Sequence, residues 1–146
     1  MATPAMAAMT ANNSDRAEKD GKVQAQPVGA AKRIYQGALV VTDDTTGLLE
    51  AGGDTAAKAF AGIAYEPADN SAGGAGAITC RVQKRGSFVF ALTGTAVTNA
   101  LLGKQVCISD DNTVALAATT TNDIYCGDII AVESGRVRVR LDRAAG

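Results

Sequence analysis

The chain has 146 residues and a mass of 14.8 kDa, a size that suits one domain. Hydrophobic residues make up 47% of it, which is enough for a core and argues against disorder along the full length. The 14 basic and 15 acidic side chains leave a net charge of −1, which excludes a nucleic-acid binder that works by bulk positive charge. Histidine is absent, so Ser-His and Cys-His catalytic pairs and His-ligated metal sites are excluded as well.

The three cysteines, Cys80, Cys107 and Cys126, are far apart and odd in number, unlike those of a secreted disulfide scaffold. Their apolar neighbours predict buried thiols on strands, as in a protein that folds in a reducing cytoplasm. The N-terminus lacks the basic region of a signal peptide. No apolar run approaches the roughly 18 residues that span a bilayer. We therefore expect a soluble protein without a membrane partner.

Residues 1–27 contain no aromatic residue, no Leu, no Ile and a single Val. Such a segment buries too little apolar area to offset the entropy lost on ordering. The sequence therefore predicts an extended, flexible N-terminal arm over residues 1–29 and a β-rich domain over residues 30–146.

In the β-rich domain, short runs of strand-forming residues alternate with turn residues. Strands are predicted at 34–35, 38–42, 48–49, 58–65, 77–83, 87–92, 104–108, 113–116, 128–132 and 135–141. The last run alternates strictly, which predicts that Val137, Val139 and Leu141 face inward. Residues 67–76 indicate an exposed loop, and residues 96–102 fit either a short helix or a strand.

The domain also contains a weak internal repeat. The segment from Gly37 to Asp44 resembles the segment from Gly103 to Asp111, and a glycine-containing strand follows each at a similar distance. Each copy then carries an Arg/Val run, Arg81–Gln83 in the first and Arg136–Arg138 in the second. Two related β-units would close on a shared core as a barrel or a sandwich.

No group of residues indicates catalysis, a metal site or a cofactor. The Asp43-Asp44 and Asp110-Asp111 pairs supply too few oxygen ligands for calcium and are typical of hairpin turns. The glycines at 73–76 precede a strand, not a helix, which does not fit a phosphate-binding loop. Basic residues gather at 81–85 and 136–140, where they fit either a solvated strand face or a contact with an acidic protein. No aromatic residues alternate with these basic residues as stacking platforms for bases, so nucleic acid is a less favoured partner than an acidic protein.

The stretches Gln36–Asp44, Ala61–Ala64 and Val82–Gly86 resemble the small capsid cement, or head decoration, proteins of tailed bacteriophages. The segment from Leu102 to Ile130 has the same pattern of glycines and strands, so the resemblance covers roughly residues 30–142. It implies a β-barrel or β-tulip-like domain that is usually trimeric and non-enzymatic. Members of this family clamp neighbouring major capsid subunits on the outside of the virion, and an N-terminal arm often reaches across the shell.

We therefore expect a homotrimeric structural protein, made in the host cytoplasm, that binds the major capsid protein. Five basic residues in and after the arm are the expected contacts with an acidic capsid surface: Arg16, Lys19, Lys22, Lys32 and Arg33. The alternative is a small β-barrel module for ligand binding or adhesion, with residues 67–76 as the rim of its site.

Overall fold

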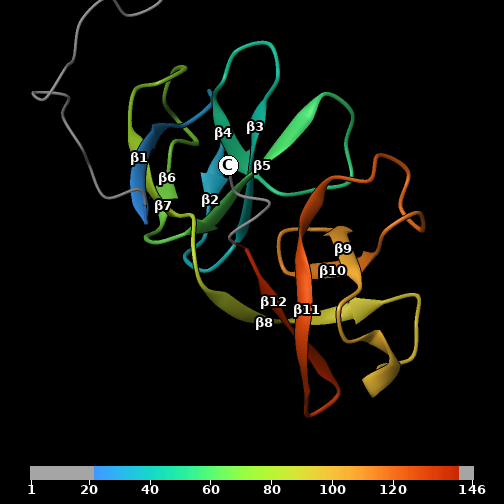
Figure 1. Ribbon diagram of the computed structural model, residues 1–146. Helices are drawn as coiled ribbons and strands as arrows, with labels where there is room; N and C mark the ends of the chain where they lie inside the picture. The colour runs from blue at the N-terminus through green and yellow to red at the C-terminus, as the bar shows by residue number, and fades with distance from the viewer. Residues whose placement is uncertain (1–21, 142–146) are drawn as a thin grey trace, which may run out of the picture.

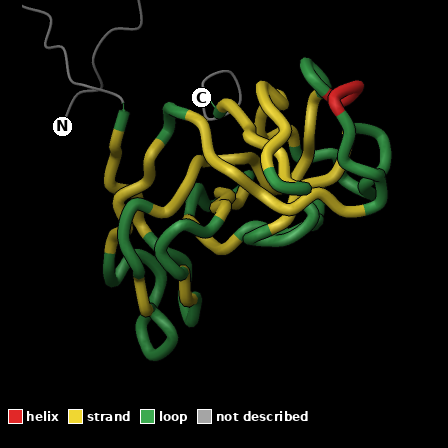
Figure 2. The backbone as a smooth tube through the Cα atoms, turned by 90° about the horizontal axis from the view of Figure 1, so that it is seen from below, coloured by secondary structure: helices red, strands yellow, loops and turns green. Residues whose placement is uncertain are grey.

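The computed structural model describes residues 22–141, and nearly all of its regular structure is β-strand (Figure 1). The predicted all-β class is therefore confirmed. A single 3₁₀ turn, η1 (Asn99–Leu101), occupies the run that fitted either a helix or a strand (Figure 2). The strands are β1 (Val23–Pro27), β2 (Arg33–Ile34), β3 (Leu39–Asp43), β4 (Leu49–Ala51), β5 (Lys58–Ala64), β6 (Ala68–Asp69), β7 (Thr79–Gln83), β8 (Ser87–Thr93), β9 (Gln105–Ile108), β10 (Thr113–Leu116), β11 (Tyr125–Glu133) and β12 (Arg136–Arg140).

The strands form two units with the same internal order. Unit 1 (residues 22–84) contains a five-stranded sheet in the order β1-β7-β5-β3-β4, and β2 pairs with β6 beside it. In unit 2 (residues 86–141), the strands follow the order β8-β12-β11-β9-β10. Strand β10 also pairs with β8, which closes the sheet into a barrel. Figure 1 shows the chain passing from unit 1 into unit 2 just before β8.

Several backbone hydrogen bonds occur at equivalent positions in the two units. The Gly37 N–H donates to Ala64 O at 2.9 Å, and the Gly103 N–H donates to Ile129 O at 2.8 Å. The pairing of β3 with β5 shifts register between Phe60 and Gly62, and that of β9 with β11 shifts between Tyr125 and Gly127. The predicted internal repeat is therefore a structural duplication.

The match corrects one part of the predicted repeat. Gly62 packs against Val82 and the Gln83 carbonyl, whereas Gly127 packs against Val139 and the Arg140 carbonyl. The segment Arg81–Gln83 is therefore equivalent to Arg138–Arg140, two residues beyond the run predicted from sequence. The Arg/Val alternation is periodic, so the sequence alone left the register open by multiples of two.

The two units differ in how they close. In unit 2, β10 pairs in parallel with β8 through Ala91, Leu92 and Thr93. Within the described residues of unit 1, a single parallel bridge, Val28 to Leu49, joins the equivalent edges. Pro27 occupies the position of Ala91, and proline has no N–H to donate to a neighbouring strand. Unit 1 is therefore a more open version of the same barrel.

Strand β1 corrects the predicted extent of the arm. Residues 23–27 were assigned to the arm, but they pair with β7 along their whole length. Most of their side chains are exposed, so no apolar pattern marks them as a strand. Backbone hydrogen bonding holds β1 in place. The rest of the predicted arm, residues 1–21, lies outside the described residues.

Two apolar clusters form the core. The smaller one fills unit 1 and includes Val40, Cys80 and Val82. The larger one fills unit 2 and also takes in four side chains of unit 1: Leu39, Val41, Phe60 and Ile63. These four residues join the two units into one hydrophobic body. All three cysteines are free and buried, as predicted.

Two polar side chains order the turns of unit 1. The Asp43 carboxylate accepts hydrogen bonds from the N–H groups of Thr45 and Thr46, which confirms the predicted turn. It also forms an ion pair with Lys58 Nζ at 2.7 Å. Asn70 is 2% exposed, and its Nδ2 donates to the carbonyls of Gly29 and Gly74 at 2.8 and 2.9 Å. The loop at 67–76 is therefore anchored to the body of unit 1.

Candidate functional site

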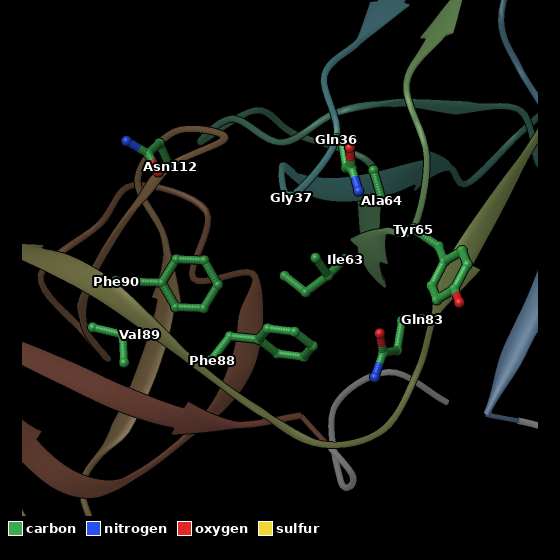
Figure 3. A pocket seen from close by; sticks show the side chains of 10 residues that line it. All are labelled: Gln36, Gly37, Ile63, Ala64, Tyr65, Gln83, Phe88, Val89, Phe90 and Asn112. Atoms are coloured by element: carbon green, nitrogen blue, oxygen red, sulfur yellow. The ribbon is translucent and has the colours of Figure 1, made fainter.

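A groove of about 500 Å³ lies between the two units. Unit 1 supplies one wall through the ends of β5 and β7 and the turn before β3, and unit 2 supplies the other through β8. Its ten lining residues carry no formal charge: Gln36, Gly37, Ile63, Ala64, Tyr65, Gln83, Phe88, Val89, Phe90 and Asn112. Figure 3 shows the rings of Phe88 and Phe90 turned toward Ile63, with Tyr65 and Gln83 on the other side. The groove is thus apolar at its centre and amide-lined at its ends.

The first of two arginine–tyrosine pairs joins Arg33 of β2 to Tyr35, the residue before the groove residue Gln36. The Arg33 guanidinium lies 4.9 Å from the centre of the Tyr35 ring. Asp69 of β6 accepts from Arg33 Nη1 at 3.2 Å and so fixes the arginine over the ring. Hydrogen bonds from Ser71, followed by the charge of Arg33, lower the pKa of the Asp69 carboxyl. Tyr35 is 59% exposed, so its ring packs against Arg33 and can still contact another molecule.

The second pair repeats this arrangement at the end of β5. The Arg81 guanidinium lies 5.1 Å from the Tyr65 ring centre, and Glu66 accepts from Arg81 Nη2 at 3.0 Å. The same carboxylate accepts the Arg81 N–H, and the hydrogen bonds from Arg81 lower the pKa of Glu66. Tyr65 is 46% exposed. Tyr35, Tyr65, Arg33 and Arg81 are called the Arg–Tyr patch below.

The patch presents aromatic surface without net charge. Each arginine is balanced by a carboxylate, and each tyrosine ring lies under its arginine. Tyrosine and arginine are the residue types that contribute most often to protein–protein binding energy. Side chains that are already ordered lose less entropy on binding. The arrangement is therefore suited to contact with another protein.

The structure shows the surroundings of three of the five predicted contact residues. Lys32 pairs with Glu50 at 3.3 Å, and Arg33 pairs with Asp69. Lys22 is exposed, and its carbonyl accepts the Lys84 N–H. Arg16 and Lys19 lie outside the described residues. Lys32 and Arg33 thus already have acidic partners within the chain.

Sequence reasoning missed both tyrosines. The i, i+2 spacing of Arg33 and Tyr35 was a local indication, since such residues share one face of a strand. Tyr65 and Arg81 are 16 residues apart and meet only because β5 pairs with β7. The loop at 67–76, predicted as a rim in the alternative interpretation, contributes no residue to the groove.

Residues 22–141 contain no group of three or more potential metal ligands among His, Cys, Asp and Glu. In the same range, no helix has the length and apolar character needed to cross a membrane. Burial raises the pKa of each cysteine thiol. No protein-family model, curated protein or solved structure matches the chain.

Proposed function

We propose that this protein is a structural component of a tailed-bacteriophage virion that binds the outside of the major capsid shell and stabilises it. The observation that carries the proposal is the Arg–Tyr patch, in which two exposed tyrosines each lie under a charge-balanced arginine. The resemblance of residues 30–142 to capsid cement proteins supports the same role. The protein acts without catalysis, as a homotrimer whose repeated contacts add up by avidity.

Contact through the patch differs from contact through basic residues alone. Lys32 and Arg33 form ion pairs within the chain, so an acidic capsid surface would compete with Glu50 and Asp69 for them. Exposed ion pairs are weak and are screened by salt. We therefore expect capsid binding to change little with salt if the tyrosines dominate, and to fall with salt if Arg16, Lys19, Lys22, Lys32 and Arg33 dominate.

The test uses heads of the phage that encodes the chain, purified without this protein. Wild-type and variant proteins are added, and bound protein is measured by co-sedimentation. The Tyr35→Ala/Tyr65→Ala variant should bind at least about 30-fold more weakly, because a central aromatic contact contributes about 2 kcal/mol or more. Leu102→Ala, which also removes an exposed apolar side chain, is the matched control.

Binding of the double tyrosine variant at the wild-type level would refute the role of the patch. Failure of the wild-type protein to bind or heat-stabilise expanded heads would refute the capsid function itself. Charge reversal at Lys32 and Arg33 tests the basic contacts, with thermal unfolding as the control for the lost ion pairs. Light scattering on free and head-bound protein tests the trimer.

A further inference from the structure

The wall of the groove formed by β8 has an open backbone edge. The Leu141 N–H donates to Gly86 O at 2.9 Å, and the next pairs along this ladder are Phe88 with Val139 and Phe90 with Val137. Hydrogen-bonded pairs alternate in an antiparallel ladder, so the N–H and C=O of Ser87 and Val89 point away from β12. On that side, β10 pairs with β8 only from Ala91 onward.

Among residues 22–141, no strand covers the outward edge at Ser87 and Val89. An uncovered edge next to an apolar groove can accept one more strand, which gains main-chain hydrogen bonds and side-chain contacts together. The lining determines which strand fits. Gln36, Gln83 and Asn112 can bond a peptide backbone, whereas no lining residue would compensate a buried charge.

The chain carries a segment of matching chemistry. Residues 1–14, outside the described part, have the sequence MATPAMAAMTANNS, which contains no charged side chain and all three methionines of the protein. Methionine fills irregular apolar spaces and makes favourable contacts with aromatic rings. Three of the lining residues, Tyr65, Phe88 and Phe90, are aromatic.

The distance from the start of the described chain, at Lys22, to the groove is short. The Lys22 carbonyl accepts the Lys84 N–H at 2.7 Å, and Lys84 directly follows the lining residue Gln83. The seven residues 15–21 can span at most about 25 Å when fully extended. A tether of this length places the segment at a high effective concentration near the groove.

We propose that the groove binds residues 1–14 of its own chain as an added strand along the edge at Ser87 and Val89. This binding site does not depend on the capsid function. It would cover the apolar centre of the groove and attach the first residues of the chain to unit 2.

The methionines provide a direct readout in the full-length protein. Selective ¹³C-methyl labelling gives three NMR signals, all from this segment. Bound methyl groups next to Phe88, Phe90 or Tyr65 should be displaced upfield by the ring currents, independently of protein concentration. Three signals at random-coil positions would overturn the proposal. Displacement that disappears on dilution would show that a second copy supplies the segment, and would overturn binding within one chain.

Two variants link the shifts to the groove. Val89→Pro removes the outward N–H and should return at least one displaced signal to its random-coil position. Its matched control is Ala25→Pro, at the equivalent outward position of β1, which should leave all three signals unchanged. Gln83→Glu adds a charge to the groove without changing side-chain size, and should act like Val89→Pro. If both groove variants fold and keep the wild-type shifts, the groove is not the binding site.

Discussion

The duplicated glycines Gly62 and Gly127 provide a quantitative test of the fold. Their φ angles are +142° and +155°, in a region that residues with a side chain rarely adopt. A Cβ on Gly62 would collide with the Gln83 carbonyl and lie 2.7 Å from Val82 Cγ1. A Cβ on Gly127 would collide in the same way with Val139 and the Arg140 carbonyl. Each glycine thus allows two strands to approach at a bulge.

We expect Gly62→Ala and Gly127→Ala each to lower the free energy of unfolding by at least about 3 kcal/mol. Backbone strain contributes about 1–3 kcal/mol and overpacking a similar amount. For a chain of this size, 3 kcal/mol lowers Tm by about 10 °C. Urea unfolding followed by circular dichroism and thermal scans measures both quantities.

Gly74→Ala is the matched control, because a Cβ added to Gly74 would meet nothing within 4 Å and its φ is not positive. We expect this variant to stay within about 1 kcal/mol of the wild type. The shared core also predicts a single unfolding transition in every variant. A change below about 1 kcal/mol for Gly62→Ala or Gly127→Ala would refute the close approach. Separate transitions for the two units would refute the shared core.

Three further predictions concern polar and thiol groups. The hydrogen bond from Lys58, with those from the turn backbone, holds the pKa of Asp43 below its ordinary value of 3.8. The unfolded chain therefore binds a proton first as the pH falls, so the stabilisation is complete above about pH 4 and is lost below it. Tm of the Asp43→Asn variant should accordingly fall less than that of the wild type between pH 5 and pH 2. Asn70→Ala should cost about 2–3 kcal/mol in urea unfolding, because it removes the donor to the carbonyl of the buried residue Gly29; a wild-type midpoint would contradict this. A thiol reagent should label the three buried cysteines only after unfolding, and rapid labelling of the native protein would contradict their burial.

The sequence predicted those parts of the fold that have a local pattern. The run at 136–140 alternates valine and arginine, and β12 has buried Val137 and Val139 as expected. Strand β1 has no such pattern, because its two faces are both largely exposed and its pairing with β7 depends on backbone groups. The Lys84–Gly86 segment, between the strands predicted at 77–83 and 87–92, carries the chain from one unit to the other, since β7 and β8 have different partners.

The candidate site was less predictable because it forms between segments that are distant in sequence. The groove combines the ends of β5 and β7 with β8, and it exists only because the two units pack together. Phe88 and Phe90 alternate with Val89 like the side chains of any strand with one buried face. Their position beside an open edge depends on where β10 begins to pair, which composition does not reveal.

Equivalent residues differ between the face of unit 1 that packs on unit 2 and the matching face of unit 2. Leu39, Phe60 and Ile63 on unit 1 are buried against unit 2. The matched strand registers make Gln105, Tyr125 and Asp128 their equivalents on unit 2. There, the Tyr125 hydroxyl donates to Asp128 Oδ2 at 2.7 Å, so the position that is apolar in unit 1 carries a hydrogen-bonded polar pair in unit 2. Burying that face under a further unit would cost desolvation without new partners. On the described part of the chain, the proposed contacts concentrate at the groove beside β8 and at the exposed rings of Tyr35 and Tyr65.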